Sequence, residues 1–479
     1  MGTPVQIAGF RQFYFPHPGC VAEGLSFRRG PGSSAGPPLI TIQKLVMVGS
    51  YPGLLTHHID KVHAVGLRVS IPPPEQSEPG GGYQGSVGAL SSGLTIGQIV
   101  ADGAELDVMG SADDKPLIFR IPKLVLNNLE DKHPLTFNAS VQIPQPPADV
   151  DVGGKFGPWQ AGNAGQTRLS GSYAVRNMDL GVFGGIGGLL ASKGSFDGVL
   201  QHVLVQGTTE IPKFVITRSG HPLSLKSEFH AIVNGLNGDV AFDPVTAHFA
   251  KTTIVATGTV AGTSDAPGVG KTLTMEAYST QARVQDLVRL FIREPTSPML
   301  GTITFRAKVT VPPEKRSFID KVRLSGDFGI AGGSYTSPET QKNIDVLSAR
   351  ARGKADQVED KDDKLGNDNY DPGRVVSNVK GHVELRNSVA HLSNISFDVP
   401  GASASVNGTY NVITERINCT GQMRLDTELS KATTGVKSFL LKIIQPLTAS
   451  RKHKGSIVSL TIGGTYHNPT YTVLPVAKK

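Results

Sequence analysis

Apolar and polar residues alternate along most of this chain with a period of two. The clearest segment is 304–311, where every odd position is apolar and every even position is polar. Segments 395–399 and 458–462 repeat the pattern. Successive side chains of a β-strand point to opposite sides of the sheet, so each segment predicts a strand with one apolar and one polar face.

Short turn signals separate these strands. The Asn-Gly pairs at 237–238 and 407–408 are typical of tight turns, and they predict antiparallel hairpins and meanders. A chain of 479 residues exceeds the size at which one hydrophobic core stops growing. Two domains or one elongated repetitive architecture are therefore expected.

Helical signals are few. Segment 284–292 has apolar residues at helical spacing, 338–350 begins with a proline suited to a first helical turn, and 435–444 ends before Pro446. Each is short enough to cover a sheet as a lid or plug rather than to join a helical bundle.

Loops and a domain boundary follow from composition. Gly- and Pro-rich stretches predict loops at 30–38, 72–82 and 144–147, and the charged segment 354–374 predicts a mobile insertion. The composition changes around 149–157, which predicts an N-terminal β region at 1–150 and a C-terminal β region at 151–479.

The net charge of +7 is compatible with anionic lipid headgroups, lipopolysaccharide or nucleic acid. The basic clusters at 451–454 and 478–479 are typical of a solvated loop and a frayed end. Aromatic residues make up 6% of the chain and no groove-reading motif occurs, so nucleic acid is not an expected partner. Cys20 and Cys419 have no metal-ligand spacing and do not indicate a disulfide framework.

Three motifs suggest chemistry but lack the required context. The Gly268–Thr272 segment resembles the end of a phosphate loop, yet Asp265 replaces its first glycine and a strand pattern follows. The Gly32–Gly36 segment has nucleophile-elbow spacing but prolines on both sides. The histidines, including His57, His58 and His63, form no zinc-protease pattern. We therefore expect no catalytic residue, no cofactor and no metal site.

The glycine-rich segment 180–191 is too short to span a bilayer, which requires about 20 apolar residues, and it lacks the third glycine of a dinucleotide loop. A short, close-packed apolar helix or turn is expected. No other segment of the sequence is long and apolar enough to span a membrane, and residues 1–15 do not resemble an export signal.

An ordered series of segments resembles the AsmA-like family, in particular its C-terminal region. These are 170–190, 195–198, 203–207, 381–385, 399–402, 408–410, 421–425, 434–441 and 460–471, with looser similarity at 4–10, 15–27, 42–55 and 65–69. The resemblance covers about four fifths of the chain. Larger relatives such as TamB and YhdP are regarded as bridge-like lipid transporters between inner and outer membranes.

The resemblance implies an elongated, twisted antiparallel sheet that forms an open apolar groove, with a few short helices. It also implies a periplasmic protein that is tethered to the inner membrane by an N-terminal helix. The sequence begins near the first strand of the family pattern, so we expect an in-frame apolar helix to be encoded upstream of Met1.

Two functions from different classes follow. The first is a non-enzymatic envelope protein involved in outer-membrane biogenesis that handles or transfers phospholipid. The acyl chains of the phospholipid would lie against an apolar face of the protein that includes Phe305, Val309, Phe397 and Leu425. The second is a structural β-sandwich or an adhesin-like binding module whose apolar faces pack against each other. The two differ in whether the apolar face is open or closed.

Overall fold

The computed structural model describes residues 5–27, 40–71, 95–108, 117–130, 133–160, 163–262, 270–314, 316–352, 375–426, 456–465 and 468–475. Within these ranges the protein is mainly β, with 70% of residues in strands and 9% in helices. The predictions at 30–38, 72–82, 354–374, 435–444, 451–454 and 478–479 fall outside the described residues, as does the Gly32–Gly36 segment.

The strands follow one another along the sheet in nearly the same order as along the chain. They are β1 (Val5–Gln6), β2 (Gly9–Phe13), β3 (Gly19–Phe27), β4 (Ile40–Val48), β5 (His58–Ile71), β6 (Thr95–Val108), β7 (Leu117–Leu129), β8 (Leu135–Pro144), β9 (Pro147–Phe156), β10 (Arg168–Asp179), β11 (Ile186–Gly187), β12 (Leu189–Val199), β13 (His202–Ile216), β14 (Leu223–Val233), β15 (Val240–Phe249), β16 (Thr252–Gly262), β17 (Lys271–Arg283), β18 (Met299–Val311), β19 (Arg323–Tyr335), β20 (Ser377–Arg386), β21 (Val389–Val399), β22 (Ala402–Asn411), β23 (Ile417–Leu425), β24 (Ser456–Gly464) and β25 (Pro469–Pro475).

The helices are short connections, apart from the last one. They are α1 (Tyr51–Leu55), η3 (Ala164–Gln166), η4 (Leu180–Phe183), α2 (Val284–Val288), α3 (Phe318–Lys321) and α4 (Pro338–Ala351). The predicted helix at 338–350 is thus confirmed as α4, whereas the predicted helix at 284–292 is shortened to α2. No helix in the described ranges is long and apolar enough to cross a membrane.

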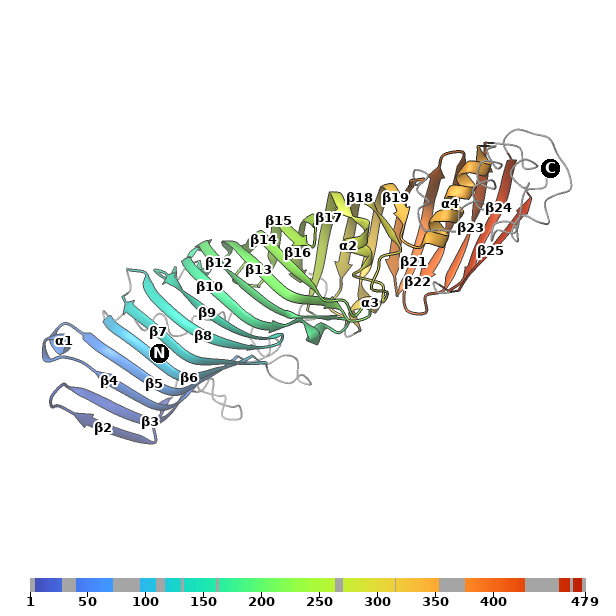
Figure 1. Cartoon of the computed structure of the whole chain (residues 1–479). Helices are drawn as coiled ribbons and strands as arrows, with labels where there is room; N and C mark the ends of the chain where they lie inside the picture. Colours follow the sequence, from blue (N-terminus) through green and yellow to red (C-terminus); the bar gives the residue numbers. More distant parts are fainter. Residues whose placement is uncertain are drawn as a thin grey trace.

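All these strands belong to one long, open, twisted sheet (Figure 1). Neighbouring strands pair antiparallel, which confirms the predicted fold, except that β5 and β6 are parallel. The short β1 pairs beside β2 on β3, and β11 pairs with the end of β13. The predicted boundary at 149–157 coincides with β9, which is bonded to both β8 and β10, so the sheet continues through it.

The two Asn-Gly predictions have opposite outcomes. Asn237 and Gly238 form the turn between β14 and β15, where the Gly238 amide donates to the Asn234 carbonyl. The second prediction is wrong, because Asn407 and Gly408 lie inside β22. Gly408 faces Leu392 and Cys419 on the adjacent strands, and an added Cβ there would lie 2.7 Å from the Cys419 sulfur. This glycine therefore allows close packing between strands rather than a reversal of the chain.

Glycines keep the two faces of the sheet distinct near the N-terminus. Gly24, Gly66 and Gly103 lie at matching positions in β3, β5 and β6, and each has φ near +60°. This conformation adds one residue to the alternation, so Ala64 before Gly66 and Leu67 after it both pack in one apolar cluster. Without the extra residue, half of each strand would present its apolar side chains on the wrong face.

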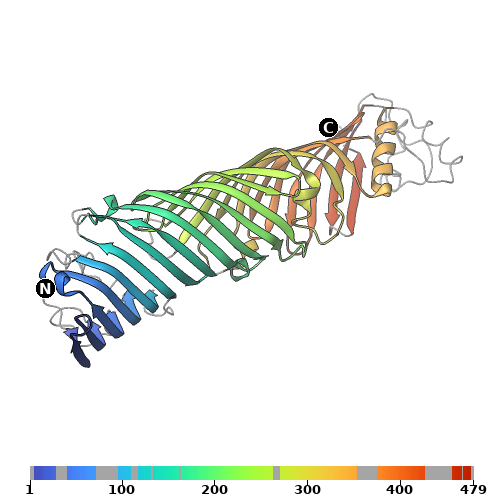
Figure 2. The same cartoon turned by 60° about the vertical axis from the view of Figure 1, so that its left-hand side comes forward.

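The described strands belong to a single twisted sheet, which Figure 2 shows from a second side. The bulkiest side chains with less than 2% exposure are those of Thr167, Thr252, Ser348 and Ser377. The described part of the chain therefore has no large hydrophobic core of the kind found between two packed layers.

Candidate functional site: the apolar face of the sheet

One face of the sheet carries an unbroken row of apolar, glycine and tyrosine residues, one from each strand from β3 to β23 except β11. Each residue of the row is directly paired with the next across the sheet. The row runs Cys20, Met47, Val62, Ile99, Leu126, Phe137, Gly154, Gly171, Phe196, Val205, Ala231, Phe242, Gly258, Met275, Val309, Leu324, Leu385, Ala390, Tyr410 and Ile417. With about 4.8 Å between neighbouring strands, this path is about 90 Å long. We call the face that contains it the apolar face.

The opposite face, here called the polar face, is lined by hydroxyl, amide and charged side chains. One of its paired rows runs Lys123, Ser140, Asp151, Ala174, Lys193, Thr208, Glu228, Thr246, Val255, Tyr278, Arg306, Asp327, His382 and Ser393. Acidic and basic residues interact across it, for example Arg176 with Asp151 and Lys226 with Glu210. The polar face is thus suited to water over most of the sheet's length.

Side chains of the same type are more enclosed on the apolar face. On the adjacent positions 208 and 209 of β13, Thr208 on the polar face is exposed and Thr209 on the apolar face is half-buried. Ser195 and Ser192 of β12 differ in the same way. A curved sheet crowds the side chains on its concave side, so we infer that this part of the sheet curves towards the apolar face.

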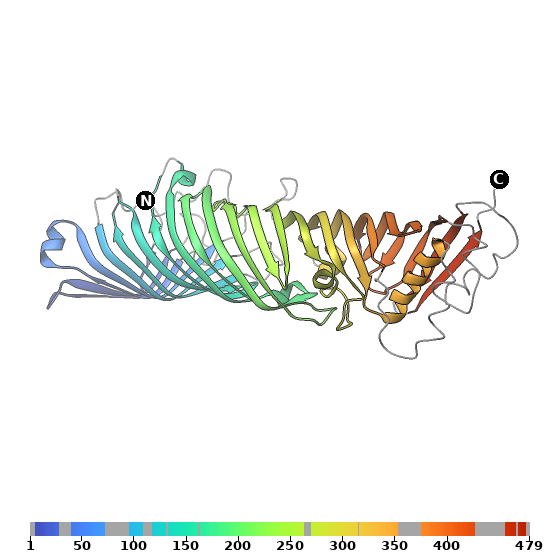
Figure 3. The same ribbon diagram turned by 45° about the horizontal axis from the view of Figure 1, so that its top comes forward.

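Helix α4 closes the apolar face near the C-terminal end of the sheet, where Figure 3 shows it lying across the last strands. Its Leu347 and Ala351 pack against Val399, Ala402 and Leu425, and Phe397 borders the cluster. Leu425 is only 3% exposed. Of the four residues expected on an open apolar face, Phe397 and Leu425 therefore belong to a small packed core, which the sequence did not separate from the open surface.

The other two expected residues, Phe305 and Val309, lie on the open part of the apolar face. Both belong to β18 and are half-buried, with Arg306 and Lys308 exposed on the polar face between them. Val309 pairs with Met275 and Leu324, and Phe305 pairs with Ser279 and Phe328. The predicted alternation in this strand is confirmed.

The segment 180–191 forms η4, β11 and the start of β12, which confirms a turn but not close packing. Val182 and Phe183 are 45% and 43% exposed, and Leu189 is 55% exposed. The Asp179 carboxylate stabilises the turn by accepting a hydrogen bond from the Gly181 amide.

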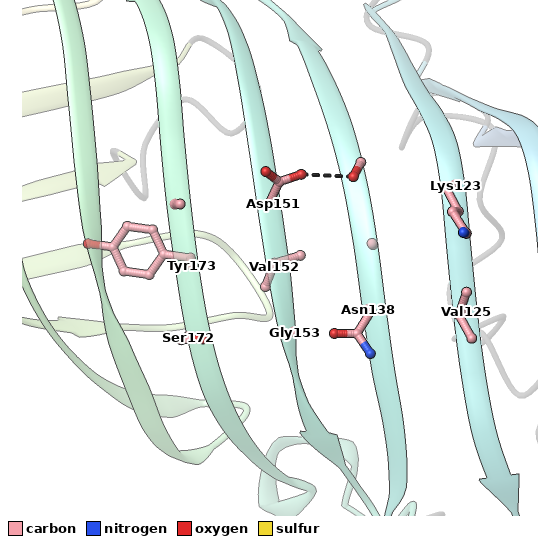
Figure 4. Close-up of a pocket in the computed structure, with 11 residues that line it drawn as sticks. Lys123, Val125, Asn138, Asp151, Val152, Gly153, Ser172 and Tyr173 are labelled. Carbon is pink, nitrogen blue, oxygen red and sulfur yellow. Dashed lines mark hydrogen bonds between the residues drawn. The ribbon is translucent and has the colours of Figure 1, made fainter.

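Shallow hollows occur on the polar face where small residues adjoin long ones. The hollow in Figure 4 lies over β7 to β10, with Lys123 and Asn138 at one side and Ser172 at the other. In it, the Ser140 hydroxyl donates to Asp151 at 2.8 Å. This bond and the one from Arg176 hold the pKa of Asp151 below its usual value. The hollow contains a solvated ion pair rather than an enclosed binding site.

Ser325, His382 and Asp327 form a chain of contacts that resembles a hydrolytic triad. The Ser325 hydroxyl lies 3.2 Å from His382 Nε2, and His382 Nδ1 lies 2.7 Å from Asp327. The Asp327 side chain is 82% exposed, and the three residues lie on the polar face within a regular ladder that already engages the neighbouring backbone amides. A triad requires free donors to stabilise the oxyanion, so this arrangement does not have the form of a hydrolase site.

The phosphate-loop-like segment and the histidines noted in the sequence do not come together in one site. Lys271 begins β17, where its ammonium group contacts Asp239 and the Asn237 carbonyl, so a strand occupies the place that a phosphate loop gives to a helix. His58 contacts Thr95 and His63 contacts Asp102. Within the described ranges no cluster of three or more His, Cys, Asp or Glu side chains could hold a metal ion.

The two long edges of the sheet meet in a contact that we call the clasp. Turns at successive strand ends alternate between the two edges, so the turn after β13 and the turn after β22 belong to opposite edges. Arg218 from the first donates to the Ile413 carbonyl at 2.8 Å and to Glu415 at 3.0 Å in the second. The Phe318 amide likewise donates across the edges to the Gly184 carbonyl at 3.0 Å. The sheet is therefore coiled enough for its opposite edges to touch.

We expect the Arg218–Glu415 pair to stabilise this coil measurably. Both side chains are less than one quarter exposed, so their coupling in a double-mutant cycle with Arg218→Met and Glu415→Gln should be about 1 kcal/mol. The matched control is the exposed cross-strand pair Lys226–Glu210, whose coupling should be close to zero. Urea unfolding measures both, and equal couplings would show that the clasp adds nothing beyond a surface ion pair.

Comparisons with known proteins found no match for this chain: no protein-family model, no curated protein and no solved structure matches it. The AsmA-like resemblance thus remains a prediction from the sequence segments given above.

Proposed function

We propose that this protein binds phospholipids and guides their acyl chains along the apolar face, as an envelope protein of the AsmA type without an active site. The single observation that carries the proposal is the paired apolar row from Cys20 to Ile417 on one open sheet. Acyl chains are long and apolar and need a continuous path shielded from water. A row of about 90 Å offers such a path over a length greater than a bilayer's thickness of about 40–45 Å.

The cost of exposing the apolar face to water also supports this role. A face of this length exposed to water would be costly at about 25 cal/mol per Å² of apolar surface, whereas bound acyl chains remove that cost. The coil held by the clasp surrounds the middle of the apolar face with the sheet's own strands. In the proposed role the chain lies in the periplasm and handles lipid between the inner and outer membranes.

The alternative function as a β-sandwich module loses its structural basis. A sandwich requires two sheets whose apolar faces pack together, and the described strands belong to one open sheet. The only sizeable cover found on the apolar face in the described ranges is α4, over its C-terminal end. An apolar face without a second sheet packed on it favours a bound apolar ligand at the place where a sandwich has its second sheet.

Photo-crosslinking tests the proposal on a single strand. With benzoylphenylalanine at Phe305, on the apolar face, irradiation in cells grown with radiolabelled phosphate should give a protein–phospholipid adduct. The same residue at Thr304, on the polar face one position away, is the matched control and should give none. Equal labelling at both positions, or none at either, would contradict the proposal.

A further inference from the structure

The N-terminal end of the sheet presents five large apolar side chains to solvent. Tyr14 and Phe15 lie in the turn between β2 and β3, and Tyr51, Leu54 and Leu55 belong to α1. Phe15 is 90% exposed and Leu55 is 85% exposed, and the other three are more than half exposed. Figures 1 and 3 place α1 and β2 at one extreme of the molecule. We call these five residues the N-terminal tip.

The tip is a built structure rather than two independent loops. The Tyr51 hydroxyl donates to the Tyr14 carbonyl, and the Gly49 amide donates to the Pro18 carbonyl at 2.9 Å. Ser50 caps α1 by accepting a hydrogen bond from the Gly53 amide, and Gly53 is buried beneath it. The apolar side chains are therefore held outward by loops whose own polar groups are paired.

The form and composition of the tip fit a lipid bilayer. Its side chains project from a turn and a short helix at the end of the sheet, which suits insertion into a soft surface better than contact with a flat protein surface. Tyrosine, with an apolar ring and a polar hydroxyl, is enriched at membrane–water interfaces, and phenylalanine and leucine are favourable in the acyl region below. Arg11, Lys44 and Lys61 outnumber Glu23 and Asp60 on the adjoining strands, which favours an anionic surface.

The apolar face begins directly beneath the tip. Cys20 is the second residue of β3 and Met47 is the next-to-last residue of β4, so the first two members of the apolar row adjoin the turns that carry the tip. An acyl chain that leaves a bilayer at this point reaches the row without crossing bulk water. Because the tip is continuous with the apolar row, a membrane that supplies acyl chains is favoured over other apolar partners.

We propose that the N-terminal tip inserts shallowly into an anionic phospholipid bilayer and forms the entry or exit of the apolar face. This inference rests on the proposed function, and it adds the surface by which the sheet meets the membrane.

The test places a fluorescent reporter in the tip. Trp159 is the one tryptophan of the chain, so Phe15→Trp combined with Trp159→Phe gives a single reporter at the most exposed position. Vesicles of phosphatidylethanolamine and phosphatidylglycerol should shift its emission to the blue, and brominated lipids should quench it. Trp159 in the wild-type protein is the control and should be unaffected. An unchanged emission from the tip reporter would overturn the proposal.

A loss-of-function variant supplies the second readout. Phe15→Ser combined with Leu55→Ser should lower vesicle affinity about tenfold or more, because both substitutions remove apolar area that the lipid would bury. Leu204→Ser, at an exposed leucine on the polar face, is the matched control and should bind vesicles as the wild type does. Both variants should keep the thermal midpoint of the wild type.

Two further outcomes separate the possibilities. The lipid co-purified with the tip variant should match the wild type, so vesicle binding lost with bound lipid retained supports the tip. If no lipid co-purifies with any form but the tip reporter still inserts, the proposed function fails and membrane docking stands. If the variant instead dissociates an oligomer in gel filtration with unchanged vesicle affinity, the tip joins copies of the chain and the membrane proposal is overturned.

Discussion

Replacement of Val309 by aspartate is expected to remove most of the bound phospholipid while the protein remains folded. Val309 lies on the open part of the apolar face, half-buried between Met275 and Leu324. Water reaches a carboxylate there when no lipid is bound, so its cost to the free energy of unfolding should be about 1 kcal/mol, well below that of a buried charge. An acyl chain, by contrast, must leave water to pass the same carboxylate.

Lipid extraction with mass spectrometry and circular dichroism measure the two effects. Thr310→Asp is the matched control, because it introduces the same charge on the polar face one position further along, next to Arg323 on β19. This control should retain both fold and lipid. If Val309→Asp unfolds the protein, the apolar face at β18 is covered by a packed layer and the open-face account is wrong.

Replacement of Leu425 by aspartate is expected to have the opposite effect, a large loss of stability. Leu425 is packed beneath α4 with Leu347, Ala351, Val399 and Ala402. A carboxylate there has no partner and no access to water, so the cost should be several kcal/mol. Helix α4 should detach from the sheet, which hydrogen exchange of residues 338–351 would reveal as lost protection. Unchanged protection would show that the helix does not depend on this cluster.

The contrast between these two variants explains what the sequence could and could not predict. Alternation in β18 and β24 follows from residue types alone, because a half-exposed strand must separate its apolar and polar side chains. The same alternation occurs at Phe305 and at Phe397, yet only Phe397 borders the cluster beneath α4. Whether a face is open or covered depends on where a distant helix packs, and the alternation of apolar and polar residues within a strand does not predict that.

Two other features depended on tertiary structure. β5 pairs with β6 in parallel, and neither strand's composition distinguishes this pairing from an antiparallel one. The clasp joins Arg218 to Glu415, residues 197 positions apart, through a coil of the whole sheet. By contrast, Gly66 interrupts the alternation of β5 by one residue, and this interruption can be predicted from the sequence alone.

The N-terminal tip escaped sequence analysis for a similar reason. Segments 14–18 and 49–57 contain the large apolar residues Tyr14, Phe15, Tyr51, Leu54 and Leu55, and such residues are buried in most folded proteins. Only the positions of the turns at the end of an open sheet leave Phe15 and Leu55 exposed. The exposure of these side chains is thus a property of the assembled edge rather than of either segment.

The lipid content of the purified wild-type protein tests the central claim most directly. The protein should be extracted gently, separated from free micelles and vesicles, and analysed for phosphorus and by native mass spectrometry. The open apolar face predicts at least one phospholipid for each chain, with none on a control protein of similar charge. A monodisperse, folded protein that carries no phospholipid and takes up none from vesicles would contradict the account.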